Sequence, residues 1–163
     1  MNPKGVIREK VKVVFKLDPE EWHGHSTESV WGAVKKSNGN IIDIENSPFF
    51  VRGVSYRDSV RVTAKNGSYL FSKMVKKSGY ATVRVLIENY REKKRLVTKA
   101  LGELERLECR YEGGAIGDSQ LFSIAVPPSA AAKEVMRIVE GGCVRDLWDA
   151  EIADSAGRTE FSE

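Results

Sequence analysis

The spacing of apolar residues changes halfway along the chain, and this change constrains the fold more than any other feature. Before residue 80, apolar and polar residues alternate in short runs that are separated by turn residues. After residue 80, alternating runs are interrupted by two stretches in which apolar residues recur at helical spacing. Period two is typical of half-buried strands and a period near 3.6 is typical of helices. The sequence therefore predicts an all-β first half and a mixed second half.

The first half carries five alternating runs and two strong hairpin signals. Asn38-Gly39 and Asn66-Gly67 stand between such runs, and Asn-Gly favours tight hairpins because both residues accept positive φ. Strands are predicted at residues 11–17, 28–36, 41–48, 59–65 and 69–76. Because closure is the usual way in which a short sheet removes its exposed edges, we expect a small β-barrel over residues 1–79.

The second half predicts the order strand, helix, strand, strand, helix, strand. The expected strands are 81–88, 108–112, 120–126 and 145–153, and the expected helices are 90–107 and a segment from an N-cap at Ser129 to Val139. Gly113-Gly114 is interpreted as part of a turn and Gly141-Gly142 as the end of the second helix. This order is typical of a ferredoxin-like domain, which we assign to residues 80–154, with 155–163 as a flexible tail.

One core is expected beneath the two predicted helices of this α+β protein, because the residues concerned share the matching periods. Its predicted members are Val83, Val85, Ile87, Leu96, Val97, Leu101, Leu104, Phe122, Ile124, Val135, Val139 and Trp148.

Net charge, apolar runs and cysteine spacing limit the kinds of function and the cellular location that are expected for this protein. The 163 residues include 26 Lys and Arg against 23 Asp and Glu, a net charge of +3, which is too balanced to favour nucleic-acid binding by itself. No apolar run is long enough for a transmembrane helix, and the N-terminus lacks a signal-peptide core, so we expect a cytoplasmic protein. Cys109 and Cys143 form no ligand-spaced pair and are expected to be buried apolar residues.

Residues that often carry catalysis or bind cofactors do not form a recognisable pattern. His23 and His25 lie two residues apart in an acidic loop, a poor metal geometry, and are expected to be exposed loop residues. The glycine-rich segment 113–117 lacks the Lys-Ser/Thr of a phosphate loop and precedes a strand rather than a helix. We therefore predict no catalytic residue, no metal and no cofactor.

Four sequence segments carry recognisable motifs. Glu28 with Trp31 resembles an acidic-x-x-Trp pattern, and residues 46–50, Asn-Ser-Pro-Phe-Phe, resemble an Asn-x-Pro-Phe-Phe core. Asp58 followed by Val60 resembles Gly-Asp-x-Val, although Arg57 replaces the glycine. Residues 78–84 resemble Ser-Gly-His/Asn-x-Thr-x-Arg, with Tyr80 in place of the polar residue. Together, these segments resemble those of a bacterial family known as domain of unknown function 4265, over roughly residues 10–150.

These motif residues allow two interpretations. In a folding role, Asn46 bonds its own backbone and fixes the turn at Pro48, while Phe49 and Phe50 plug the barrel. Gly79 then supplies a positive φ, and Arg84 pairs with Asp58 or Glu28. In a binding role, a polar cluster forms a cleft beside aromatic side chains. The members of that cluster are Glu28, Asp58, Ser78, Thr82 and Arg84.

The resemblance implies a small bacterial protein similar to the immunity proteins of polymorphic toxin systems. The leading hypothesis is a non-enzymatic immunity protein, an antitoxin that binds a cognate toxin. Its expected anchors are aromatic and arginine side chains in loops: Trp22, Arg52, Tyr56, Arg57 and Tyr80. One alternative is a nucleic-acid- or nucleotide-binding module that uses the barrel. Another is an enzyme built around Glu28, Asp58 and Arg84.

Overall fold

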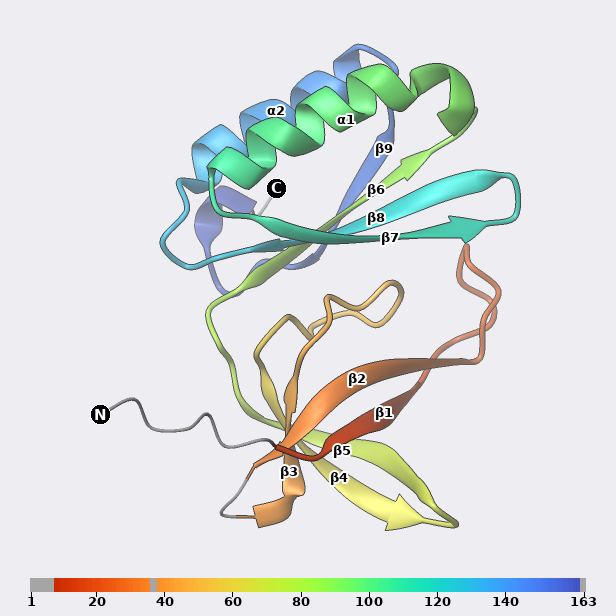
Figure 1. The fold of residues 1–163 in the computed structure, drawn as a ribbon, viewed down its shortest axis with the longest axis vertical. Coiled ribbons are helices and arrows are strands. Elements are labelled where there is room, and N and C mark those ends of the chain that lie inside the picture. The colour runs from red at the N-terminus through yellow and green to blue at the C-terminus, as the bar shows by residue number, and fades with distance from the viewer. Residues whose placement is uncertain (1–7, 36–37, 162–163) are drawn as a thin grey trace.

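A computed structural model describes residues 8–35 and 38–161 of the chain. Within these residues it contains nine strands in two sheets and two α-helices (Figure 1). The first five strands are β1 (Lys10–Lys16), β2 (Thr27–Lys35), β3 (Asn38–Ile44), β4 (Ser59–Lys65) and β5 (Ser68–Lys76). They confirm the five predicted strands to within a few residues. The first hairpin turn was predicted at residues 37–40, but Asn38 and Gly39 begin β3, and Asn38 lies opposite Lys35 of β2. Residues 36 and 37 lie outside the described residues.

The five strands form a closed ring, here called the ring, because β1 pairs with strands on both of its sides. It is antiparallel to β2 and, through Val13 opposite Tyr69, parallel to β5. The interior is filled by alternate, mostly β-branched residues and by Phe15, whose ring centroid lies 4.9 Å from that of Phe71. Phe49 and Phe50 were expected to plug this interior; they lie outside it, in the loop that follows β3.

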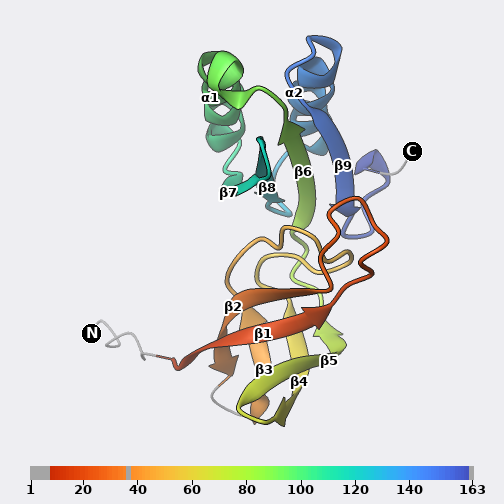
Figure 2. The same ribbon diagram turned by 90° about the vertical axis from the view of Figure 1, so that its right-hand side faces the viewer.

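The second sheet has the strand order β7-β8-β6-β9, and all its pairs are antiparallel. Its strands are β6 (Ala81–Ile87), β7 (Arg110–Ile116), β8 (Ser119–Val126) and β9 (Asp149–Asp154). Helix α1 (Tyr90–Arg106) follows β6, and α2 (Ala132–Val144) follows β8. Both helices cover the face of this sheet that is turned away from the ring (Figures 1 and 2). Neither described helix combines the length and the apolar composition that a membrane crossing requires.

The predicted core forms between this sheet and its helices. Eleven of the twelve predicted members belong to one buried cluster, in which Trp148 also donates a hydrogen bond of 2.9 Å to the Val139 carbonyl. Leu96 is the exception, with 49% of its surface exposed. It lies on α1 beside the buried Val97, and one residue is a rotation of about 100° on a helix. The buried stripe of α1 is therefore narrower than the sequence pattern predicts.

Two pairs of glycines were placed wrongly. Gly113 and Gly114 lie inside β7, not in a turn. A Cβ on Gly113 would lie 2.7 Å from the Phe122 ring, so this glycine makes room for an aromatic side chain on the neighbouring strand. Gly141 and Gly142 lie inside α2, where a Cβ on Gly142 would lie 2.3 Å from the Trp148 ring. Close packing, rather than chain reversal, explains Gly113 and Gly142.

The ends of the second helix and of the chain also differ from expectation. Ser129 is not the N-cap, because α2 begins three residues later with Ala131 at that position. The last strand begins at Asp149 rather than at 145. Residues 155–161, expected to be a flexible tail, include a short 3₁₀ helix (Thr159–Phe161) whose Phe161 is buried in the core. Cys109 is buried as predicted, whereas Cys143 is exposed.

Candidate functional site

The residues of the family motifs meet where the ring contacts the helix-free face of the second sheet. The loop between β3 and β4, residues 45–58, lies between the two (Figures 1 and 2) and is here called the junction loop. The loop between β1 and β2 rises beside β9 (Figure 2). Two groups of buried polar side chains hold the junction loop, one around Glu28 and Arg84 and the other around Asp58.

Glu28 holds the first part of the junction loop by its backbone N–H groups. Its carboxylate accepts hydrogen bonds from the amides of Phe49, Phe50 and Val51 at 2.5, 2.9 and 2.9 Å. The side chain comes from β2, where strand alternation buries it against the loop. Three backbone donors in a row thus find one charged acceptor, as buried amides require.

Arg84 holds the same segment by its carbonyl groups. Its guanidinium donates to the carbonyls of Pro48 and Phe50, at 3.2 and 2.8 Å, and to that of Val51. The Arg84 side chain is 1% exposed, and an ion pair of 3.1 Å with Glu151 compensates its buried charge. Burial lowers the pKa of Arg84 from its usual value, while the charges of Glu151 and Glu28 oppose that change.

The predicted partners of Arg84 were Asp58 or Glu28, and this prediction is wrong as a direct contact. The ion-pair partner is Glu151 on β9, and the other acceptors are backbone carbonyls. Two serines, Ser47 and Ser123, add further hydrogen bonds between the junction loop and the second sheet. Ser123 on β8 donates to the Pro48 carbonyl at 2.6 Å and, because its only proton is used there, accepts from Ser47 at 2.7 Å.

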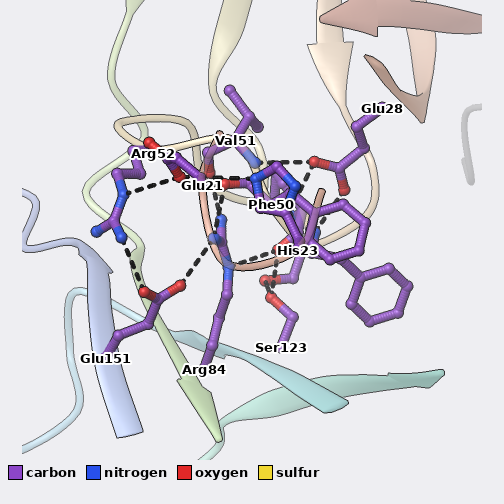
Figure 3. A network of polar contacts seen from close by, with 12 residues as sticks. Glu21, His23, Glu28, Phe50, Val51, Arg52, Arg84, Ser123 and Glu151 are labelled. Atoms are coloured by element: carbon purple, nitrogen blue, oxygen red, sulfur yellow. Dashed lines mark hydrogen bonds and ion pairs between the residues drawn. The ribbon is translucent and has the colours of Figure 1, made fainter. Parts of the chain in front are cut away.

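The ion pairs continue from Arg84 to the surface (Figure 3). Glu151 also binds Arg52 at 2.9 Å, and Arg52 lies 3.9 Å from Glu21 in the β1–β2 loop. Half of the Arg52 side chain is exposed. This chain of charges links the buried Arg84 to the half-exposed Arg52 and to Glu21 in the β1–β2 loop.

Asp58 organises the second polar group. Its carboxylate accepts from the amides of Ser55 and Ser78, both at 2.8 Å, and from Lys77 at 2.5 Å. Lys77 also pairs with Asp154. Burial by itself would lower the pKa of Lys77, but its hydrogen bonds with Asp154 and Asp58 outweigh burial and raise it.

Ser55 and Thr82 extend this second group to the sheet. Ser55 donates to Asp154 at 2.7 Å, so the contact of 2.6 Å with Thr82 is one in which Thr82 donates. Burial would raise the pKa of Asp154, but hydrogen bonds from Lys77 and Ser55 outweigh it and lower the pKa. The five residues of the predicted polar cluster are therefore divided between two groups. Ser78 is half-buried, and the other four are buried between the two halves.

Four further motif residues make contacts of their own or adopt a particular backbone conformation. Ser78 donates to the Tyr56 carbonyl at 2.7 Å, and Gly79 has the predicted positive φ, 92°. Asn46 donates to Glu112 on β7 at 2.6 Å instead of bonding its own backbone. Trp31 is 48% exposed on the ring, with the Lys12 ammonium 5.0 Å from its ring centroid.

The histidines were expected to be exposed, and only His25 is. His23 is buried, accepts a hydrogen bond from the His25 amide at 2.9 Å, and lies 4.7 Å from the Phe50 ring centroid. Its Nε2 atom lies 3.6 Å from a Glu21 carboxylate oxygen. Among the described residues, no three His, Cys, Asp or Glu side chains gather as a metal-ligand set.

The five predicted anchors separate into two groups. Trp22 and Arg52 are connected through Glu151. Glu151 forms an ion pair with Arg52, and it lines an apolar hollow of about 180 Å³ together with Trp22, Leu86 and Leu121. Tyr56, Arg57 and Tyr80 form the other group. The Tyr56 ring lies edge-on to Tyr80, with centroids 5.0 Å apart, and is covered by the guanidiniums of Arg57 and Arg110. Arg110 had no sequence signal, because it is an isolated basic residue at the start of β7.

Comparison with known proteins confirms the resemblance found in the sequence motifs. The model of the family described as "Domain of unknown function (DUF4265)" matches residues 28–150. The chain is also similar to a structure described as "Novel crystal structure of a hypothetical protein from Neisseria gonorrhoeae", with a TM-score of 0.69 and 17% identity. That similarity covers 91% of this chain and 95% of the other, and at this identity it shows the fold alone. No curated protein matches.

Proposed function

This chain belongs to the DUF4265 family, and on that premise we propose that it is a non-enzymatic immunity protein that binds a cognate toxin. In this proposal the ring is a small β-barrel and the second sheet is a ferredoxin-like domain. The strand order β7-β8-β6-β9, with a helix after β6 and after β8, supports the second assignment. The two domains together form a rigid platform that presents loops to the partner.

The use of the motif side chains favours a binding platform over an enzyme. An enzyme built on Glu28, Asp58 and Arg84 would need their polar atoms for a substrate. In the structure, the carboxylates of Glu28 and Asp58 accept hydrogen bonds from backbone amides, and the Arg84 guanidinium donates to backbone carbonyls inside the junction. Groups engaged in this way rigidify the loops that they hold.

The single observation that carries the proposal is the surface formed by Trp22 and Arg52. Trp22 is 47% exposed although it is the largest side chain of its loop, and its ring contacts Phe50 edge-on at 6.0 Å. Beside it lie the apolar hollow lined by Leu86 and Leu121 and the half-exposed Arg52. A half-exposed tryptophan, an arginine and an apolar hollow on a supported surface are the features of a protein-binding hot spot.

Co-expression with the product of the adjacent gene in a sensitive host tests this function. We expect the neighbour to be toxic alone and this protein to restore growth. The variant Trp22→Ala with Arg52→Glu should lose protection, because both anchors are removed. Trp31→Ala is the matched control, because Trp31 is equally exposed but lies on the ring.

The possible results of this experiment test the immunity function and the location of the toxin-binding surface separately. A harmless neighbour would contradict the immunity proposal. Protection that survives the Trp22 and Arg52 changes would contradict this surface. If protection is then lost on changing Tyr56, Arg57 and Tyr80, the partner binds the other predicted group. Circular dichroism of each variant checks that the fold is kept.

A further inference from the structure

A second surface, on the ring and apart from Trp22, is a groove of about 500 Å³ lined mainly by charged residues. The groove runs across strands β2 to β5. Asp43 on β3 lies opposite Ala33 of β2 and Ser59 of β4. Ser59 in turn lies opposite Lys76 of β5. Its basic lining residues are Arg8, Lys35, Arg57, Lys76 and Lys77. Asp43 and Glu45 are its acidic ones. The excess of basic over acidic lining residues equals the whole chain's net charge of +3.

Three of these cations are not neutralised by a carboxylate. Arg8 pairs with Asp43 at 2.8 Å, and Lys77 pairs with Asp58 and Asp154. In residues 8–35 and 38–161, by contrast, no ion pair involves Lys35, Arg57 or Lys76. The groove therefore has two cations that are paired with carboxylates and three free cations, meaning cations that form no ion pair within the described residues. An excess of unpaired cations attracts anions.

Arg57 is held in place by its own backbone and by an aromatic ring. It has a φ of 67°, a left-handed conformation that costs a bulky residue energy unless its surroundings impose it. Its amide donates to the Ile44 carbonyl at 2.8 Å. Its guanidinium carbon lies 5.2 Å from the Tyr56 centroid, and that of Arg110 lies 4.8 Å from the same centroid. Two guanidiniums are thus positioned around one ring at the edge of the groove.

We propose that this groove binds the phosphate groups of a nucleotide or oligonucleotide. Phosphate fits the lining, since Arg and Lys are the side chains that most often bind phosphate oxygens. The volume lies in the usual range for small-molecule sites. Base stacking is not part of the proposal, because the Tyr56 ring is already covered by arginines. Recognition therefore acts through charge and not through base identity.

Binding to two probes at low salt tests the groove: inorganic pyrophosphate by calorimetry and a labelled single-stranded RNA 12-mer by fluorescence anisotropy. We expect binding that weakens about ten-fold or more in Lys35→Glu with Lys76→Glu, because two of the three free cations are reversed. The double variant Lys94→Glu with Lys99→Glu is the matched control. It makes the same charge change on the exposed face of α1 and should bind within about two-fold of wild type.

The two probes also separate the sources of phosphate. Pyrophosphate that binds as tightly as RNA indicates a compact nucleotide site. RNA that binds more tightly indicates a strand, and the slope of log affinity against log salt should then fall by roughly 1.4 in the double variant, about 0.7 for each lost contact. The proposal is overturned if neither probe binds at about 50 mM salt, or if both lysine pairs have equal effects. Either result leaves the toxin-binding proposal untouched, since Trp22 lies outside this groove.

Discussion

The two faces of the four-stranded sheet are both buried, yet they are buried by different chemistry. Toward the helices, β6 presents Val83, Val85 and Ile87 to an apolar core. Toward the ring, the same strand presents Thr82 and Arg84 to a seam of hydrogen bonds and ion pairs. The comparison shows that a strand can be buried on both sides while its sequence still alternates. The polar half of that alternation marks a junction between two parts of the protein, not a solvent-exposed face.

The largest expected effect comes from removing the charge at the centre of the polar face. Arg84→Met removes the guanidinium that donates to the Phe50 and Val51 carbonyls. It also removes one of the two donors to the Pro48 carbonyl and the buried cation that pairs with Glu151. Breaking a buried charged pair in this way costs about 3–5 kcal/mol in the free energy of unfolding. Urea denaturation followed by circular dichroism measures this change.

Arg52→Met is the matched control for that experiment. Arg52 binds the same Glu151, but half of its side chain is exposed, and exposed ion pairs contribute about 1 kcal/mol or less. Equal losses for Arg84 and Arg52 would mean that the buried contacts add nothing beyond a surface ion pair.

On the apolar face, a pair of adjacent glycines separates packing from helix propensity. Gly142→Ala places a Cβ 2.3 Å from the Trp148 ring and should destabilise the protein by about 1–3 kcal/mol. Gly141→Ala meets no atom within 4 Å and should stabilise it by up to about 1 kcal/mol through better helix propensity. Thermal unfolding of the two variants measures the difference. Effects of the same sign would contradict the packing assigned to α2.

The ion pair between Lys77 and Asp154 makes the polar face sensitive to pH, unlike the apolar face. The pKa of Asp154 is lowered below its usual 3.8, so its stabilising contribution is complete above that pH and is lost as the pH falls through the lowered value. The pKa of Lys77 is raised above 10.5, so its contribution is lost only as the pH rises through the raised value. The stability lost in Asp154→Asn should therefore be greatest between these limits and shrink below about pH 4. Urea denaturation of both proteins across this range tests it, and a constant difference would contradict the prediction.

The apolar face was predictable from the sequence, and the polar face was not. Period two predicts a strand at residues 81–88, and β6 spans Ala81–Ile87, because this signal is local. The partner of Arg84 could not be found in this way. Glu151 lies 67 residues away, and the other acceptors are backbone carbonyls, which have no sequence signature.

The glycines also show that roles set by local backbone conformation can be predicted from the sequence, whereas roles set by distant contacts cannot. Gly79 was predicted correctly because its role is a local backbone conformation. The sequence predicts a turn at Gly113 and a helix end at Gly142, whereas in the structure each glycine makes room for an aromatic ring that is distant in sequence or on another element. The burial of His23 escapes prediction for a related reason, because Phe50, which contacts it, belongs to another loop.

Native-state hydrogen exchange of the junction loop tests most directly whether the family motif builds the junction. The amides of Phe49, Phe50 and Val51 lie in an irregular loop, and their acceptor is Glu28 on β2. If the two faces of the sheet are equally part of the folded core, these amides open only with the whole protein. We predict exchange rates within about ten-fold of those of the β6 amides, after correction for intrinsic rates. Exchange as fast as in an unstructured loop would contradict the account, because Glu28 and Arg84 would then not hold the two halves together.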